Sequence, residues 1–256
     1  MNFIGPLVHA SLIKRPSKTC KTPYVADVCI DSTEEVTMAH TPSLGCCGLI
    51  DNGTQCKMLM KKLEGVKKTC SHRVEFVELP NKTLLCVNPK MSEDLVELVF
   101  ANNKFSGIGL NKCKSVSREV SFTMADGENS RFDFAGVTKD NKEFILEVKS
   151  VPLTNKDSIS YFPDGYRKKK GDVVSPRALK HIQHLEEMVG KGYQSILAFC
   201  VQRGDSKGFK LSDDDVTYKN AVLKAQENGV KVVVLYFNWE LVESYAHCDL
   251  ERVEGL

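Results

Sequence analysis

The sequence changes its pattern at Pro89, and this change limits the folds open to the chain more than any other feature. Before Pro89, short apolar and β-branched stretches recur between turn signals such as the Asp-Asn-Gly at 51–53, which is typical of an all-β region. After Pro89, stretches with a helical period alternate with strand-like runs. We therefore expect a small β-barrel over residues 1–88, with an OB-like barrel among the candidates, and an α/β domain with a mixed sheet over residues 89–256.

The second domain is expected to have the element order α-β-β-β-α-β-α-β. Ser175 and Pro176 fit the N-cap and the first position of its middle helix, and Gly229 fits the end of its last helix. The expected helices are 92–101, 176–189 and 216–228, and the expected strands are 116–124, 131–137, 143–151, 195–201 and 230–237. Between the third strand and the middle helix lies a polar connection that is long enough to be a functional loop.

Composition excludes several classes of protein. The chain has 256 residues, of which 42% are hydrophobic, and this is too apolar for an intrinsically disordered protein. No apolar run approaches the ~18 residues of a membrane-spanning helix, and the start of the sequence lacks the features of a secretory signal. Ten cysteines without any C-x-x-C pair favour reduced thiols, so we expect a cytoplasmic or nuclear protein without a membrane partner.

A zinc site is the alternative explanation for part of the cysteine content. Several potential ligands lie close together in the first domain, namely Cys46, Cys47, Cys56, Cys70 and His72. Structural zinc sites usually combine two closely spaced ligand pairs, and here only Cys70 and His72 form such a pair. Packing of the thiols as small apolar side chains is therefore the favoured interpretation.

Charged residues occur on strands that otherwise look buried. In the run 143–151, Glu147 and Lys149 share one face because side chains alternate along a strand. Asp133 occupies the preceding run, and Glu119 the run before that. If the three strands are neighbours, the three carboxylates converge on one place beside Lys149.

Three carboxylates in a half-buried site repel one another, and a hard divalent cation relieves that repulsion. An all-oxygen ligand set favours Mg²⁺ or Mn²⁺ over zinc. A lysine beside such an ion can position a water nucleophile or neutralise a phosphate. The pattern therefore indicates metal-assisted hydrolysis of a phosphodiester. The alternative is an ordinary polar face of an antiparallel sheet in contact with solvent.

Basic residues downstream of the carboxylates suggest a phosphate-binding surface. Arg177, Lys180, His181 and His184 have the spacing of one stripe on the middle helix. Cations also cluster in the polar connection. Together with Arg131, the candidate DNA-binding residues are Arg167, Lys168, Lys169, Lys170, Arg177, Lys180 and His181. Contacts of this kind reach the phosphate backbone and do not read bases. The alternative is a solvated basic surface.

Four short motifs resemble the sugar fermentation stimulation protein A family. They are SRFDF at 130–134, EVKSV at 147–151, FPDG at 162–165 and RALKH at 177–181. The resemblance implies an N-terminal OB-like barrel joined to a PD-(D/E)XK nuclease-like αβββαβ domain that binds DNA. In bacteria the family is described as regulating sugar metabolism.

The resemblance also implies roles for single residues. Asp133, Glu147 and Lys149 match the D…E-x-K signature of the nuclease-like domain, and Glu119 matches an acidic position that follows an arginine. Lys180 and His181 match the helix motif of the family. The N-terminal region departs from the family where it reads Ser-Leu-Gly-Cys-Cys at 43–47.

The sequence thus predicts a DNA-binding protein with an Mg²⁺ or Mn²⁺ site formed by Glu119, Asp133 and Glu147. Asp133, Glu147 and Lys149 are the expected catalytic residues of a metal-dependent deoxyribonuclease. Two other functions stay open at this point. One is a DNA-binding regulator that retains the nuclease fold without catalysis, and the other is an interaction protein that uses the barrel. Nothing in the sequence indicates an oligomeric state.

Overall fold

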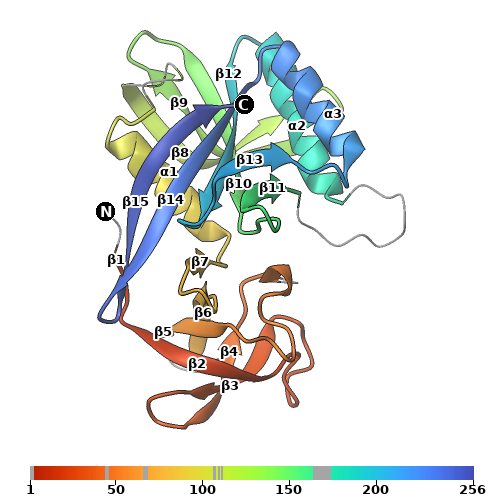
Figure 1. Ribbon diagram of the computed structural model, residues 1–256. Helices are drawn as coiled ribbons and strands as arrows, with labels where there is room; N and C mark the ends of the chain where they lie inside the picture. The colour runs from red at the N-terminus through yellow and green to blue at the C-terminus, as the bar shows by residue number, and fades with distance from the viewer. Residues whose placement is uncertain are drawn as a thin grey trace. The chain divides into compact units, whose positions relative to one another are not determined.

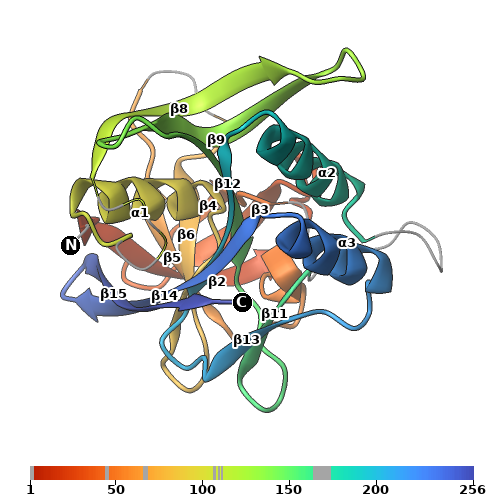
Figure 2. The same cartoon turned by 90° about the horizontal axis from the view of Figure 1, so that it is seen from above.

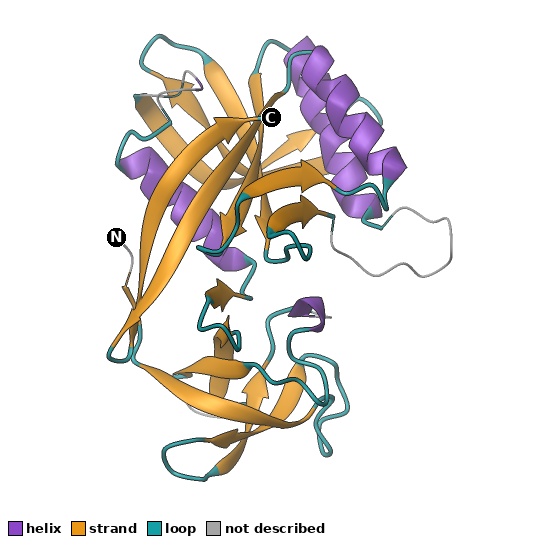
Figure 3. Cartoon of the chain, in the orientation of Figure 1, coloured by secondary structure: helices purple, strands orange, loops and turns teal. Residues whose placement is uncertain are grey.

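A computed structural model describes residues 3–43, 46–65, 69–105, 108, 110, 112–163 and 174–256. The chain divides into two compact units, and their helices and strands are shown in Figures 1 and 3. The first unit comprises Met1–Met91, Gln202–Asp205 and Phe237–Asp249, and the second comprises Ser92–Val201, Ser206–Tyr236 and Leu250–Leu256. The sequence places a single boundary at residue 88. The units differ from that division because two later segments, Gln202–Asp205 and Phe237–Asp249, also belong to the first unit.

Strands of the first unit form a closed ring. Its main strands are β2 (Leu7–Lys14), β3 (Val25–Ile30), β4 (Val36–His40), β5 (Lys57–Lys62), β6 (His72–Glu78) and β7 (Leu84–Cys86). Strand β2 pairs with β3 and β5, β3 pairs with β4, and β5 pairs with β6, all antiparallel. A parallel pairing of β4 with β6 closes the ring, and β7 extends from β6. Buried aliphatic side chains such as Val28, Ile50 and Met58 fill it.

The second unit combines helices with a mixed sheet. Its elements are α1 (Lys90–Ala101), β8 (Cys113–Thr123), β9 (Asn129–Thr138), β10 (Glu143–Val151), β11 (Ile159–Phe162), α2 (Pro176–Gly190), β12 (Gln194–Gln202), β13 (Gly208–Leu211), α3 (Val216–Glu227), β14 (Lys231–Val242) and β15 (Tyr245–Gly255). The strand order of the large sheet is β1-β15-β14-β12-β10-β9-β8, where β1 is Phe3–Ile4. Strand β10 runs parallel to β12 and antiparallel to β9. Strands β11 and β13 form a separate parallel pair.

The helices of the second unit cover both faces of its sheet. Figure 2 shows α1 on one side of β12 and α2 and α3 on the other. On the α1 side, the ring of Phe100 lies 5.5 Å from the rings of Phe134 and Phe144. On the other side, Ile182 and Val222 of the two helices belong to one buried cluster with side chains of β10 and β12. Burial of both faces explains why the central strands read as continuous apolar runs.

Local sequence signals account for the starts of two helices. The Ser175 hydroxyl accepts the N–H of Ala178 at the start of α2, and Asp215 accepts the N–H of Tyr218 at 3.0 Å at the start of α3. Short polar side chains at these positions satisfy N–H groups that a helix leaves unpaired. The expected and observed helices therefore agree within one or two residues. None of the helices in the described part of the chain has the length and apolar character needed to cross a membrane.

Candidate functional site

The site begins where two neighbouring strands separate. Strands β9 and β10 pair from Glu143 opposite Val137 as far as Leu146 opposite Phe134. The next residue of β9, Asp133, uses its side chain in place of a backbone pair, and its Oδ2 accepts the N–H of Val148 at 2.7 Å. This hydrogen bond fixes the carboxylate of Asp133 beside the C-terminal half of β10.

The alternation of side chains along these strands is interrupted at the same place. In a regular strand Phe132 and Phe134 would share a face. Here Phe132 belongs to the core under α2 and α3, whereas Phe134 packs on Phe100 of α1. In the neighbouring strand Glu119 has a φ of 52°, which is rare for a residue other than glycine. In both β8 and β9, the side chains on the two sides of this point therefore lie on faces of the sheet that regular alternation would not give them.

Glu147 lies at the centre of the site and is only 2% exposed. Its Oε1 accepts a hydrogen bond from Nζ of Lys149 at 2.5 Å and another from Nδ1 of His181. Its Oε2 is buried and has no hydrogen-bond partner among the described residues. Burial opposes ionisation of the carboxyl, but Lys149 and His181 together lower the pKa of Glu147 below its ordinary value. Glu147 is therefore a carboxylate at neutral pH with one oxygen held and the other unpaired.

The pKa of Asp133 is shifted in the opposite direction to that of Glu147. Burial and then the negative charge of Glu147 raise the pKa of Asp133 to about 7, although Val148 and Lys149 act in the opposite direction. A carboxyl with this pKa is about half protonated at neutral pH. The two acids thus share a region that does not accept two full negative charges at low cost.

These two carboxyl groups have the chemistry of ligands for a hard cation. Mg²⁺ is commonly held by one or two protein carboxylates together with water and substrate phosphate oxygens, and the unpaired Oε2 of Glu147 and the carboxyl of Asp133 fit that requirement. In the described ranges, no group of three or more His, Cys, Asp or Glu side chains is arranged to hold a metal ion. This finding covers the described cysteines of the zinc alternative as well.

Glu119, the third predicted ligand, interacts with a cation of the neighbouring strand. Its carboxylate lies 3.3 Å from the guanidinium of Arg131, and 41% of the Glu119 side chain is exposed. Both residues are candidates from the sequence, Glu119 for metal and Arg131 for DNA. The structure thus brings together Asp133, Glu147 and Lys149, and it pairs Glu119 with Arg131. A metal-binding role of Glu119 stays a prediction.

The predicted basic stripe of α2 divides into different environments. His181 reaches into the site and contacts Glu147. Arg177 is exposed, and Lys180 forms an ion pair with Glu128. His184 is buried, and burial lowers its pKa. Two of the four residues therefore face outward, where a phosphate backbone could reach them. The candidate residues Arg167, Lys168, Lys169 and Lys170 lie outside the described residues.

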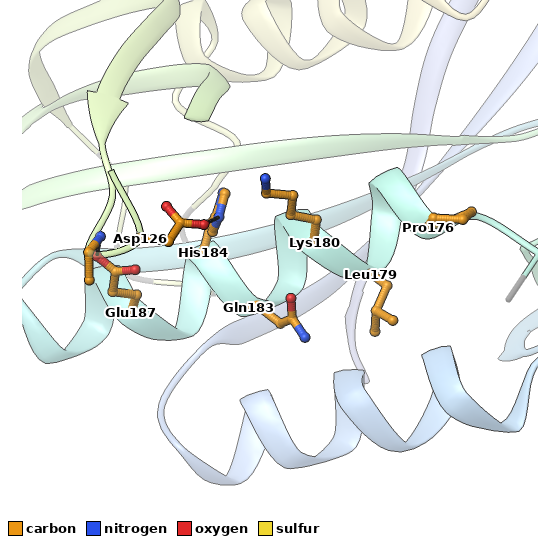
Figure 4. A pocket seen from close by; sticks show the side chains of 8 residues that line it. Asp126, Pro176, Leu179, Lys180, Gln183, His184 and Glu187 are labelled. Atoms are coloured by element: carbon orange, nitrogen blue, oxygen red, sulfur yellow. Dashed lines mark hydrogen bonds and ion pairs between the residues drawn. The ribbon is translucent and has the colours of Figure 1, made fainter. Parts of the chain in front are cut away.

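A cavity of about 410 Å³ lies along the same helix. Its lining, shown in Figure 4, is Ala125, Asp126, Pro176, Leu179, Lys180, Gln183, His184 and Glu187. Several of the polar groups in it have partners within the protein. Glu187 accepts the N–H of Ala125 at 2.9 Å and pairs with Lys191, and Nε2 of His184 lies 3.9 Å from Asp126. The cavity thus shows no polar arrangement that identifies a ligand.

An arginine cluster next to the site was not anticipated from the sequence. The guanidinium of Arg118 contacts three acidic side chains of α1, and it lies 5.7 Å from the centre of the Phe134 ring. The contacts are with Glu93 at 2.9 Å, Asp94 at 2.7 Å and Glu97 at 3.1 Å. The cluster joins α1 to β8 immediately before Glu119. The acidic spacing on α1 is the signal that could have revealed it.

Comparisons with known proteins support one family. The family model described as "Sugar fermentation stimulation protein RE domain" matches residues 90–243. The sugar fermentation stimulation protein homologue of Pelagibacter ubique is 31% identical over 232 residues, which cover 90% of this chain and 89% of the relative. The homologue of Marinomonas is 26% identical over 234 residues, or 91% of this chain and 83% of the relative.

A solved structure shows the same fold. The structure of Pyrococcus furiosus SfsA in complex with Ca²⁺ matches with a TM-score of 0.76 and 16% identity, over 97% of this chain and 96% of that one. At this identity the match shows a shared fold and no more. The family model matches more than half of the chain, and the Pelagibacter relative aligns with most of it. The chain therefore belongs to the sugar fermentation stimulation protein family.

Proposed function

We propose that this chain is a DNA-binding protein whose second unit hydrolyses phosphodiester bonds with the help of Mg²⁺ or Mn²⁺. The main support is the pair of acids at the separation of β9 and β10. Asp133 has a pKa raised to about 7, and Glu147 has a buried carboxylate oxygen without a partner among the described residues. A divalent cation relieves both conditions because it stabilises the two ionised carboxylates together.

The side chains of the site have separate tasks in this proposal. Asp133 and Glu147 would hold the cation, which would supply Lewis-acid chemistry to the phosphate and the attacking water. His181 fixes Oε1 of Glu147 and so keeps the carboxylate in one orientation. Lys149 has its ammonium 2.5 Å from the same oxygen and is 12% exposed. It can therefore hold a phosphate oxygen or orient the attacking water from inside the site.

The arrangement of strands and helices supports two specific fold assignments, an OB-like barrel and a nuclease-like domain. The five-stranded ring β2-β3-β4-β6-β5 supports an OB-like barrel, since that fold is a small five-stranded Greek-key barrel. The order α1, β8, β9, β10, β11, α2, β12 supports a nuclease-like αβββαβ layout, because β11 lies outside the large sheet and pairs with β13. The Ca²⁺ in the Pyrococcus furiosus SfsA structure also supports a site for a hard cation in this family.

Contact with the DNA backbone is proposed for the outward residues of α2 and for Arg131. Arg177 and Arg131 are exposed, and Lys180 is half-buried beside Glu128. All are on elements that adjoin the site, because Arg131 precedes Asp133 on β9 and α2 contributes His181. Such contacts favour binding without sequence specificity.

A non-catalytic DNA-binding regulator is the second candidate function. The observation in its favour is that protein side chains already engage the acidic residues. Lys149 and His181 contact Oε1 of Glu147, and the guanidinium of Arg131 pairs with Glu119. A site balanced in this way can retain the fold and bind DNA without turnover.

An assay of DNA cleavage distinguishes the two functions. Single- and double-stranded DNA are incubated with Mn²⁺ and with wild type, Asp133→Asn or Glu147→Gln, while Asp140→Asn serves as a matched control. Asp140 lies in the exposed turn between β9 and β10, where it pairs with Lys142. Cleavage by wild type and the control but not by the other two variants supports the proposal. DNA binding with equal background cleavage by all four proteins supports the regulator, and absence of DNA binding contradicts both.

A further inference from the structure

We propose that Tyr218 is a positioning residue for Glu147, and that its hydroxyl is linked by hydrogen bonding to Oε2 of that carboxylate. The inference rests on the proposed function in one respect, since Glu147 matters there as a metal ligand. It adds a residue of α3 to a site that otherwise uses β9, β10 and α2.

The first observation is an unpaired hydroxyl in the core. Tyr218 is 0% exposed, and its Oη has no hydrogen-bond partner among the described residues. Buried hydroxyl groups in proteins nearly always have a partner, because burial without one costs free energy.

The second observation is that Glu147 presents a matching acceptor. Its Oε2 is also buried and without a partner in the described part of the chain. A carboxylate oxygen has two acceptor sites. Oε2 can therefore accept a hydrogen bond from the protein and still ligate a cation with its other lone pair.

Core packing places the two groups in the same region. Glu147 lies opposite Leu197 in the parallel pairing of β10 with β12, and Lys149 lies opposite Phe199. The ring of Phe162 is 5.5 Å from that of Phe199 and 5.4 Å from that of Tyr218. Ring contacts therefore connect Phe199, the register neighbour of Lys149, through Phe162 to Tyr218.

The pKa of Tyr218 also reflects the nearby charge of Glu147. Burial and then the charge of Glu147 raise the pKa of Tyr218 well above its ordinary value. Tyr236 is the useful contrast, because it is also buried in this core. The charged groups that act on Tyr236 are Glu254 and Arg252 instead. The charges that act on Tyr218 are those of Glu147 and Asp215.

The link is assigned to one bridging water. The structure records no direct hydrogen bond between Oη of Tyr218 and Oε2 of Glu147, and buried waters in proteins typically join polar groups that lack other partners. The backbone of Tyr218 is fixed for this purpose. Oδ1 of Asp215 accepts its N–H at 3.0 Å, and Oδ2 of Asp215 accepts the N–H of Val174 at 2.7 Å. Tyr218 is thereby held at the start of α3.

Mn²⁺ affinity tests the inference. Tyr218→Phe removes only the hydroxyl, and Tyr236→Phe is the matched control. Loss of a hydrogen bond to a metal ligand typically weakens metal binding by about 10- to 100-fold. We expect that loss for Tyr218→Phe in calorimetric titrations with Mn²⁺ and an unchanged affinity for Tyr236→Phe. Equal affinities of wild type and Tyr218→Phe would overturn the inference and leave the proposed function intact.

A second measurement needs no metal. In the metal-free protein, the denaturation midpoints of wild type, Tyr218→Phe, Glu147→Gln and the double variant form a double-mutant cycle. A linked pair gives a smaller effect of Tyr218→Phe in the Glu147→Gln background than in wild type. If the effects of the two substitutions on the denaturation midpoint simply add in the double variant, the link between Tyr218 and Glu147 is contradicted. If wild type binds no Mn²⁺, the proposed function fails, and the cycle still decides whether Tyr218 and Glu147 interact.

Discussion

Asp133 is a carboxyl group whose ionisation is unfavourable in the folded chain. Burial and the neighbouring charge of Glu147 raise its pKa to about 7 from an ordinary value of 3.8. In the unfolded chain the same carboxyl ionises near its ordinary value. Between these two pKa values the folded state binds more protons than the unfolded state. The stability that Asp133 contributes is therefore fully present below the unfolded pKa and is lost as pH rises to about 7.

This difference predicts the pH dependence of an Asp133→Asn variant. Asparagine cannot ionise and keeps an oxygen that can accept the N–H of Val148. We expect the variant to exceed wild type in unfolding free energy by about 1–2 kcal/mol more at pH 8 than at pH 5, after allowance for partial solvation. Urea denaturation at the two pH values measures this change. A difference between the proteins that is the same at both pH values would contradict the raised pKa.

The order of residue types along the strands is enough to reveal this pair of acids. Alternation places Glu147 and Lys149 together, and Asp133 follows once the strands are taken as neighbours. The same rule assigns Glu119 to the cluster, whereas the structure shows it paired with Arg131. Glu119 also has a positive φ, and a short sequence pattern does not encode that backbone conformation. Tyr218 is invisible for a different reason, since a tyrosine in a helical stripe looks like any core residue.

At the scale of elements, the Arg118 cluster holds α1 against β8. One guanidinium contacts Glu93, Asp94 and Glu97, and 30% of the arginine side chain is exposed. Arg118→Ala leaves three neighbouring carboxylates without their shared cation. We expect a loss of about 1–2 kcal/mol of unfolding free energy, which becomes smaller in high salt because salt screens partly exposed charges.

Chemical denaturation at low and high ionic strength tests that expectation. The control is Lys142→Ala, which removes one exposed partner of Asp140 in the β9–β10 turn. A surface pair of this kind contributes little to stability. If Arg118→Ala lowers the unfolding free energy no more than Lys142→Ala does, the cluster is not what joins α1 to β8.

The sheet beside the site depends on a glycine in β9. A Cβ atom at Gly136 would lie 2.1 Å from the carbonyl oxygen of Ser115 and 2.8 Å from the ring of Phe144. Gly136→Ala must therefore push β8 away from β9, and overpacking of this kind costs about 1–3 kcal/mol. Thermal unfolding should show a clearly lower midpoint, while Gly190→Ala, which has open space around its Cβ, should not. Equal midpoints would show that the strands can separate freely.

Elements with a clear period are the most predictable part of the fold. The limits of α2, α3 and β10 follow from capping residues and apolar spacing, as the hydrogen bonds of Ser175 and Asp215 confirm. Strands β11 and β13 escape prediction from the sequence because each has four residues. A four-residue run shows too little alternation to be separated from a loop. Their parallel pairing is a long-range contact, and no local pattern specifies it.

At the scale of the whole molecule, a formal net charge of +2 does not suggest that the protein binds a polyanion such as DNA. The charge is a balance of separate groups. Carboxylates gather at Asp133 and Glu147, while Arg131, Arg177 and Lys180 lie on neighbouring elements. Binding of DNA is governed by such local clusters, because each neutralised phosphate releases a condensed counterion. The total charge is therefore a poor guide to the proposed partner.

The salt dependence of DNA binding tests this balance directly. Arg177 is exposed at the start of α2, and its replacement in Arg177→Ala should weaken binding equally for unrelated DNA sequences. The slope of log K against log salt should fall by about one.

Lys180 is paired with Glu128, so Glu128→Gln should release it for phosphate contact and strengthen binding. Lys219→Ala, on α3 beside Asp213, is the control and should leave the slope unchanged. Fluorescence anisotropy over a range of salt concentrations measures all four proteins. If Arg177→Ala and Glu128→Gln both match wild type, α2 does not contact the backbone, and the proposed interface must lie elsewhere.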